Sequence, residues 1–121
     1  MSLTPDSAFE VSRPWGKFLQ FTKDTPSTVK ILTVSAGEAF SLQLHHKREE
    51  MWFVLKGDGV IEINGESFPI TPNSKFLIPK EATHRITAGE NDVQVLEIST
   101  GEFDEEDIVR LEDRYGRVKN E

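Results

Sequence analysis

The sequence contains no cysteine, which excludes disulfide bonds and thiolate metal ligands. No apolar run approaches the roughly 18 residues that a membrane-spanning helix needs. The residues after Met1 also lack the basic-then-apolar pattern of a secretory signal. Basic residues are outnumbered by acidic ones, 14 against 21, so the formal net charge is −7. Because nucleic-acid binding needs a basic face, these absences predict a cytoplasmic protein with neither a nucleic-acid nor a membrane partner.

A chain of 121 residues corresponds to one domain, large enough to form a core without disulfide or metal staples. We predict a single domain over residues 8–117, with flexible tails at 1–7 and 118–121. The negative net charge does not exclude an anionic small-molecule ligand, because a local cluster of cations can oppose the global sign.

Short β-type runs separated by turn residues dominate the chain. Nine strands are predicted, at residues 17–22, 28–35, 39–45, 50–55, 59–64, 66–71, 75–78, 84–88 and 93–99. The dipeptide Asn64-Gly65 is a strong signal for a two-residue hairpin, because both central residues of a type I′ turn need positive φ. Regular spacing without intervening helices predicts an all-β antiparallel sandwich or barrel.

One short helix is predicted near the C-terminus. Asp104 is a suitable N-cap, and the apolar residues Ile108, Leu111 and Tyr115 fall on one helical stripe. Gly116 would end this helix. We therefore expect a C-terminal helix whose apolar stripe faces the barrel.

Two of the three histidines lie in a pattern that suits a metal site. Because side chains alternate along a strand, Gln43 and His45 share a face, and Glu50 can converge with them from the next strand. His84 follows a turn after Pro79 and begins a further strand. Two imidazoles, a carboxylate and an amide oxygen predict one divalent ion, zinc first, with manganese, iron, nickel and cobalt as alternatives. The open coordination position that such a set leaves is what catalysis requires.

The spacing of these residues resembles the two cupin motifs. Residues 37–57 read G-x5-Q-x-H-x4-E-x6-G, which is similar to the first motif with glutamine in place of its first histidine. Residues 73–84 resemble the second motif, with Asn73 and Glu81 where glycine is usual. This resemblance implies a double-stranded β-helix, a small jelly-roll barrel with the metal in its lumen.

A more specific resemblance extends over roughly residues 13–117. It is carried by Arg13-Pro-Trp-Gly, Leu42-Gln-Leu-His-His, Glu50-x-Trp, Ile78-Pro with Thr83-His-Arg, and the closing Asp107–Arg117 string. These strings are similar to the type II mannose-6-phosphate isomerase domain, which is often the C-terminal half of mannose-1-phosphate guanylyltransferases. The resemblance implies a metal-dependent isomerase of the GDP-mannose pathway that interconverts mannose 6-phosphate and fructose 6-phosphate through an enediolate. The Gly-rich nucleotide loop of the guanylyltransferase half is absent, and Lys47 and Met51 stand where the family often has histidine.

The resemblance leaves the roles of the other polar residues open. Candidates for the general base are Glu49, His46, Asp113 and Tyr115. Candidates for holding the phosphosugar are Arg13, Lys17, Ser41, Arg114 and Arg117, although surface ion pairs would explain the arginines equally well.

Met51, Phe53 and Leu55 form an apolar face opposite the predicted ligands. A homodimer is the predicted cover for this face, with the N-terminal strands or the C-terminal helix as the alternative. Two other functions also stay open. One is a different metal-dependent cupin chemistry, such as an oxygenase or another sugar isomerase or epimerase, and the other is a sugar-binding cupin without catalysis.

Overall fold

The computed structural model describes residues 9–117, and every regular element in that range is a β-strand. The strands are β1 (Phe9–Arg13), β2 (Gly16–Gln20), β3 (Thr28–Val34), β4 (Leu42–Leu44), β5 (Arg48–Lys56), β6 (Gly59–Ile63), β7 (Glu66–Pro69), β8 (Lys75–Ile78), β9 (His84–Ala88), β10 (Val93–Gly101) and β11 (Val109–Glu112). The described residues therefore contain no helix that could cross a membrane. The predicted tails lie outside this range.

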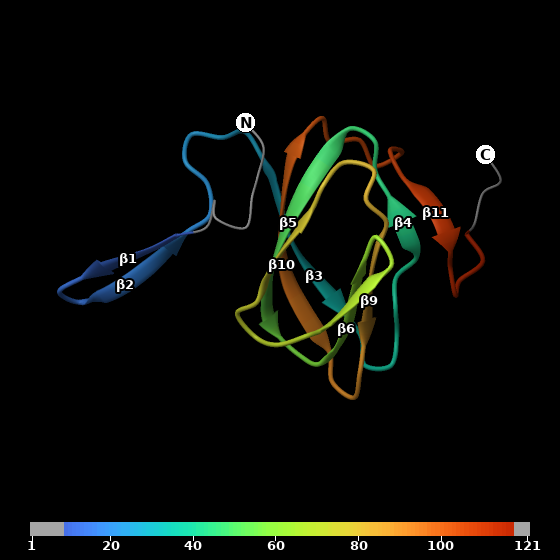
Figure 1. Ribbon diagram of the computed structural model, residues 1–121, viewed down its shortest axis with the longest axis horizontal. Coiled ribbons are helices and arrows are strands. Elements are labelled where there is room, and N and C mark those ends of the chain that lie inside the picture. The colour runs from blue at the N-terminus through green and yellow to red at the C-terminus, as the bar shows by residue number, and fades with distance from the viewer. Residues whose placement is uncertain (1–8, 118–121) are drawn as a thin grey trace.

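Two antiparallel sheets face each other and form the barrel (Figure 1). One sheet has the order β3-β10-β5-β8, and the other has the order β11-β4-β9-β6-β7. The strands β1 and β2 pair only with each other, and this hairpin projects away from the barrel (Figure 1). The predicted all-β double-stranded β-helix is confirmed.

Alternation along the strands decides which side chains line the lumen. In β5, Trp52 and Val54 point inward and are fully buried, and they pack with inward residues of the facing sheet such as Ile61 and Ile86. The ladder between β10 and β5 places Glu97 opposite Trp52 and Ser99 opposite Glu50. The apolar core therefore continues into a group of buried polar side chains inside the same barrel.

Two residues of the second predicted cupin motif adopt the left-handed conformation. Asn73 has φ 70° and Glu81 has φ 68°, and these are the positions where the motif usually has glycine. Asparagine tolerates this region better than other residues, whereas glutamate does so at a cost in backbone energy. Asn64 and Gly65 also have positive φ, as the predicted type I′ hairpin requires.

The outer face of the first sheet is covered in part by the chain itself. Met51 and Ile98 are buried there under Leu19, Phe21, Leu77 and Leu96. Phe21 packs edge to face on Phe53, with ring centroids 5.2 Å apart. The residues at and just after the end of β2 thus provide the cover that was the alternative to a dimer. The dimer itself stays a prediction.

The predicted C-terminal helix is wrong, because residues 104–116 form a turn followed by β11. The Asp107 carboxylate accepts the backbone N–H groups of His46 and Lys47, both at 2.9 Å, and so fixes the turn to the barrel. After it, β11 pairs with β4, which would otherwise be the edge of the sheet. Tertiary hydrogen bonds to the backbone therefore outweigh the local helical pattern.

Candidate metal centre

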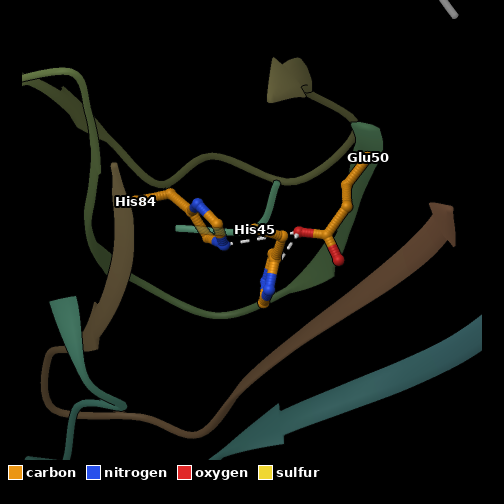
Figure 2. A group of neighbouring side chains, drawn as sticks. All are labelled: His45, Glu50 and His84. Carbon is orange, nitrogen blue, oxygen red and sulfur yellow. Dashed lines mark ion pairs between the residues drawn. The ribbon is translucent and has the colours of Figure 1, made fainter. Parts of the chain in front are cut away.

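Three side chains from different parts of the barrel converge in the lumen (Figure 2). His45 follows β4, Glu50 lies in β5 and His84 begins β9. One ligand atom from each residue lies within 4.8 Å of those of the other two. The Glu50 Oε1 atom is 3.4 Å from His84 Nε2 and 3.8 Å from His45 Nε2, and all three residues are buried.

Backbone carbonyls hold both imidazoles with their Nε2 atoms toward Glu50. His45 Nδ1 lies 2.6 Å from the Asp107 carbonyl oxygen, and His84 Nδ1 lies 2.9 Å from that of Ala82. Because a carbonyl oxygen only accepts, Nδ1 carries the hydrogen in both rings and Nε2 presents a lone pair. This is the arrangement in which metal-binding histidines are usually found.

Two atoms at the centre of the group lack hydrogen-bond partners. Glu50 Oε1 and His84 Nε2 are buried and unpaired. Burial lowers the pKa of His84 to about 4, so the ring is neutral and its Nε2 atom can only accept a hydrogen bond or ligate a metal. Leaving such atoms unsatisfied is costly, and a divalent cation would satisfy both. The His45–Glu50–His84 donor set therefore fits the predicted metal ion.

The pKa of Glu50 also suits a ligand of a metal cation. Burial, reinforced by the neighbouring Glu97 carboxylate, raises the pKa of Glu50 to about 8. A carboxylate that ligates a metal must be ionised, so metal binding at neutral pH would release a proton from this site.

Arg48 is a functional residue that the sequence analysis missed. Its Nη2 group donates to His45 Nε2 at 3.1 Å, and its Nε group donates to Glu50 Oε2 at 3.3 Å. The guanidinium is buried and stacks over the ring of Phe103, 4.5 Å from the centroid. Residues 48 and 50 share a strand face, so the same alternation that selected Glu50 would have identified Arg48.

The cluster opens on a small pocket, which we call the lumen pocket, with a volume of about 230 Å³. It is lined by Lys30, Leu32, Phe40, Gln43, His45, Arg48, Glu50, Glu97, Glu105, Ile108 and Arg110. Three of these side chains are cationic and three are acidic, and Lys30 and Arg48 form ion pairs with Glu105 and Glu50. Among them, Arg110 has a buried Nε group without a hydrogen-bond partner. The lumen pocket therefore offers an anionic ligand both a metal position and positive charge.

Gln43 and Ser41 lie beside the metal cluster. The Ser41 hydroxyl is buried and donates to Gln43 Oε1 at 2.7 Å, and Gln43 lines the lumen pocket. The backbone of Gln43 pairs with that of His84. Ligation of the metal by Gln43 stays a prediction.

The predicted general bases do not line the lumen pocket. His46 is exposed and lies 3.8 Å from the Glu81 carboxylate, and Glu49 accepts a hydrogen bond from Thr100 at 3.4 Å. Asp113 accepts hydrogen bonds from Arg117, and Tyr115 is exposed. Their catalytic roles stay predictions.

The predicted phosphate-binding arginines and lysine lie elsewhere on the surface. Arg13 stacks over Phe18 in the hairpin, and Lys17 forms an ion pair with Glu10. Arg114 donates to the Gly37 carbonyl oxygen at 2.8 Å, and Arg117 forms an ion pair with Asp113 at 2.7 Å. Each of these four cations has a local partner, and within the described residues the cations of the lumen pocket are Lys30, Arg48 and Arg110.

An antiparallel double-stranded β-helix with a His–Glu–His group in its lumen defines the cupin class. The cupin domain of Cnp3 from Schizosaccharomyces pombe matches this fold with a TM-score of 0.59, over 78% of this chain and 86% of that chain. Its sequence is 13% identical, so the likeness concerns the fold alone.

Within the cupins, the chain belongs to the family described as Mannose-6-phosphate isomerase C-terminal, which matches residues 5–113. It is 40% identical over 110 residues to a mannose-1-phosphate guanylyltransferase of Klebsiella pneumoniae, and 37% identical over 111 residues to the alginate biosynthesis protein AlgA of Pseudomonas aeruginosa. These alignments cover 89% and 90% of this chain but 23% of each relative. The suspected family is confirmed, and the chain spans under a quarter of these relatives.

Proposed function

We propose that this protein is a metal-dependent aldose–ketose isomerase that interconverts mannose 6-phosphate and fructose 6-phosphate. The observation that carries this proposal is the His45–Glu50–His84 cluster, which has two buried atoms without hydrogen-bond partners and lies beside a pocket that contains Arg110. Membership of the mannose-6-phosphate isomerase C-terminal family supports the choice of reaction.

Arg110 is the cation of the lumen pocket that we propose for binding the phosphate of the sugar. Arg110 contributes a guanidinium whose Nε–H has no partner in the structure, and a guanidinium donates to phosphate oxygens in a bidentate geometry. Lys30 also lines the pocket and forms an ion pair with Glu105 at 3.1 Å. Binding the phosphate at these cations would use energy from a remote group to orient the reacting carbons.

The metal would be held by His45, Glu50 and His84, with Gln43 as the proposed fourth ligand. When bound, the ion supplies positive charge that stabilises the negative charge developing on the substrate oxygens. Arg48 already contacts His45 and Glu50, so its guanidinium is placed to bind a sugar oxygen beside them. Trp52 and Phe40 pack edge to face, with ring centroids 6.0 Å apart, and exclude water from the inner wall.

We also propose a homodimer and a place beside mannose 1-phosphate metabolism, in the cytoplasm. Val29 and Ile31, on the edge strand β3, are 57% and 61% exposed and offer a second copy an apolar surface. The relatives named as mannose-1-phosphate guanylyltransferases support the pathway.

A phosphorus NMR time course with mannose 6-phosphate tests the isomerase directly. The purified chain would be supplied in turn with zinc, manganese, cobalt, nickel and iron, and metal content would be measured on the same samples. We expect fructose 6-phosphate to appear with at least one metal. We expect metal and activity to be lost together in His84→Ala and Glu50→Gln, but not in Glu66→Gln, an exposed β7 carboxylate. No conversion by metal-loaded protein would overturn the proposal and favour a binding cupin.

A further inference from the structure

A second buried carboxylate, Glu97, lines the lumen pocket beside the metal cluster. Glu97 lies in β10 and is 6% exposed, and it is paired in the ladder with Trp52 of β5. Its Oε2 atom accepts a hydrogen bond from the Trp52 indole N–H at 3.1 Å. Two residues further along β10, Ser99 pairs with Glu50 and its hydroxyl donates to Glu50 Oε2 at 3.4 Å, so Glu97 lies on the same strand face next to the metal cluster.

The side-chain partners of Glu97 are the Trp52 indole and the Glu50 carboxyl group, and neither is a cation. A buried carboxylate is normally paired with a cation, because burial of an isolated charge is costly. Within residues 9–117, Glu97 has no lysine, arginine or histidine in ion-pair contact, and Arg48 is directed to Glu50 and His45 instead. A neutral indole fixes the direction of the carboxylate but does not neutralise it.

Glu97 is the remaining proton acceptor of the lumen pocket once the other ionisable residues are assigned. His45 and Glu50 belong to the metal cluster. Lys30, Arg48 and Arg110 are hydrogen-bond donors without an acceptor atom. Glu105 is exposed and bonded to Lys30 at 3.1 Å.

We propose that Glu97 is the general base that moves the proton between C2 and C1 of the sugar, an inference that rests on the proposed isomerase function. The Glu97 carboxylate removes the proton from C2, and the C2–H electron pair forms the C1=C2 double bond while the C1 carbonyl electrons move onto O1. The hydroxyl proton then passes from O2 to O1. As the C2 carbonyl forms, C1 takes the proton back from Glu97. No oxidant or reductant is consumed, and one carboxylate serves both ends of the transfer.

Trp52 acts as a positioning residue for this base. Its side chain is fully buried, and its ring packs edge to face on His84 with centroids 5.5 Å apart. A single rigid indole thus contacts a metal-cluster residue and holds Glu97 at the same time. The carboxylate is therefore fixed relative to the position where the sugar oxygens would bind.

Glu97→Gln tests the inference because it removes the basic oxygen while leaving an amide oxygen to accept the Trp52 N–H. Wild type, Glu97→Gln, Glu49→Gln and Glu66→Gln would be loaded with the same metal. Metal content, mannose 6-phosphate affinity by calorimetry, exchange of the C2 proton with deuterated water, and conversion would be measured for each. Glu49 is the other glutamate that the sequence offered as a general base, and Glu66 is an exposed control residue.

We expect Glu97→Gln to keep the metal and a similar sugar-phosphate affinity, and to lose both C2 exchange and conversion by about 100-fold or more. Exchange at the wild-type rate in Glu97→Gln, or its loss in Glu49→Gln instead, would overturn the assignment while leaving the isomerase intact. Loss of metal in Glu97→Gln would also overturn it, because Glu97 would then act through the metal site. If metal-loaded wild type neither exchanges nor converts the sugar, the proposed function and the assignment both fail.

Discussion

Replacing Glu50 by glutamine should raise the stability of the metal-free protein above pH 8, where the Glu50 carboxylate is ionised, and should abolish metal binding. In the structure, Glu50 Oε1 and His84 Nε2 are 3.4 Å apart, buried and unpaired. An amide nitrogen at the Oε1 position would donate to His84 Nε2, and the amide oxygen could still accept from Arg48 Nε. Because an unsatisfied buried polar group costs about 1–3 kcal/mol, we expect a gain of about 1 kcal/mol in the free energy of unfolding above pH 8 and little change near neutral pH, where Glu50 is protonated. For a domain of this size, that corresponds to a rise of about 4 °C in Tm.

The pH dependence of the unfolding free energy should also distinguish metal-free wild type from Glu50→Gln. The pKa of Glu50 is raised from 4.5 to about 8, so between these values the folded state binds the proton and the unfolded state does not. Stability from this group is therefore lost as pH rises toward 8. His84 acts in the opposite direction, because its pKa is lowered from 6.5 to about 4 and its contribution is complete above pH 6.5. Metal-free wild type should thus become less stable between pH 6.5 and 8.5, and Glu50→Gln should lose this dependence.

Urea unfolding of chelator-treated protein at several pH values measures both effects. A parallel titration with zinc should stabilise wild type, by about 2.7 kcal/mol when free metal is one hundred times the dissociation constant, and should leave Glu50→Gln unchanged. The matched control is Glu66→Gln, which should behave as wild type throughout. A metal-free Glu50→Gln protein that is less stable than wild type at pH 8, or one that zinc still stabilises, would refute the reasoning.

Two further predictions concern backbone conformation. Glu81 has φ 68°, so Glu81→Gly should relieve left-handed strain and raise the unfolding free energy by about 0.5–1 kcal/mol, since the larger entropy of unfolded glycine offsets part of the gain. A urea midpoint at or below that of wild type would contradict this. Gly59 has φ 138°, and a Cβ there would overlap the Thr87 carbonyl oxygen in the neighbouring strand β9. Gly59→Ala should therefore cost about 3 kcal/mol or more in thermal or urea unfolding, whereas Gly65→Ala, with open space around its Cβ, should cost less.

The local residue pattern predicted strands β2 to β10, but it did not predict β1 and β11, the first and last strands of the chain. Each of the nine predicted strands overlaps a strand of the structure, because alternation of apolar and polar residues is imposed by the two faces of a sheet. The strand β11 was mistaken for a helix, since Ile108, Leu111 and Tyr115 have helical spacing. The pairing of β11 with β4 depends on residues more than sixty positions away, and no local window contains that information.

The amino-acid sequence by itself determined the fold class, the family and the group His45, Glu50 and His84. Parity along a strand and motif spacing are local properties, so they can be read without a structure. Only the tertiary structure decided which acids and cations share the lumen with that group. Glu97 is 47 residues from Glu50 along the chain, and it meets the site only because β10 pairs with β5. The charged residues of the lumen pocket come from strands that are distant in sequence, so their combination depends on the folded barrel.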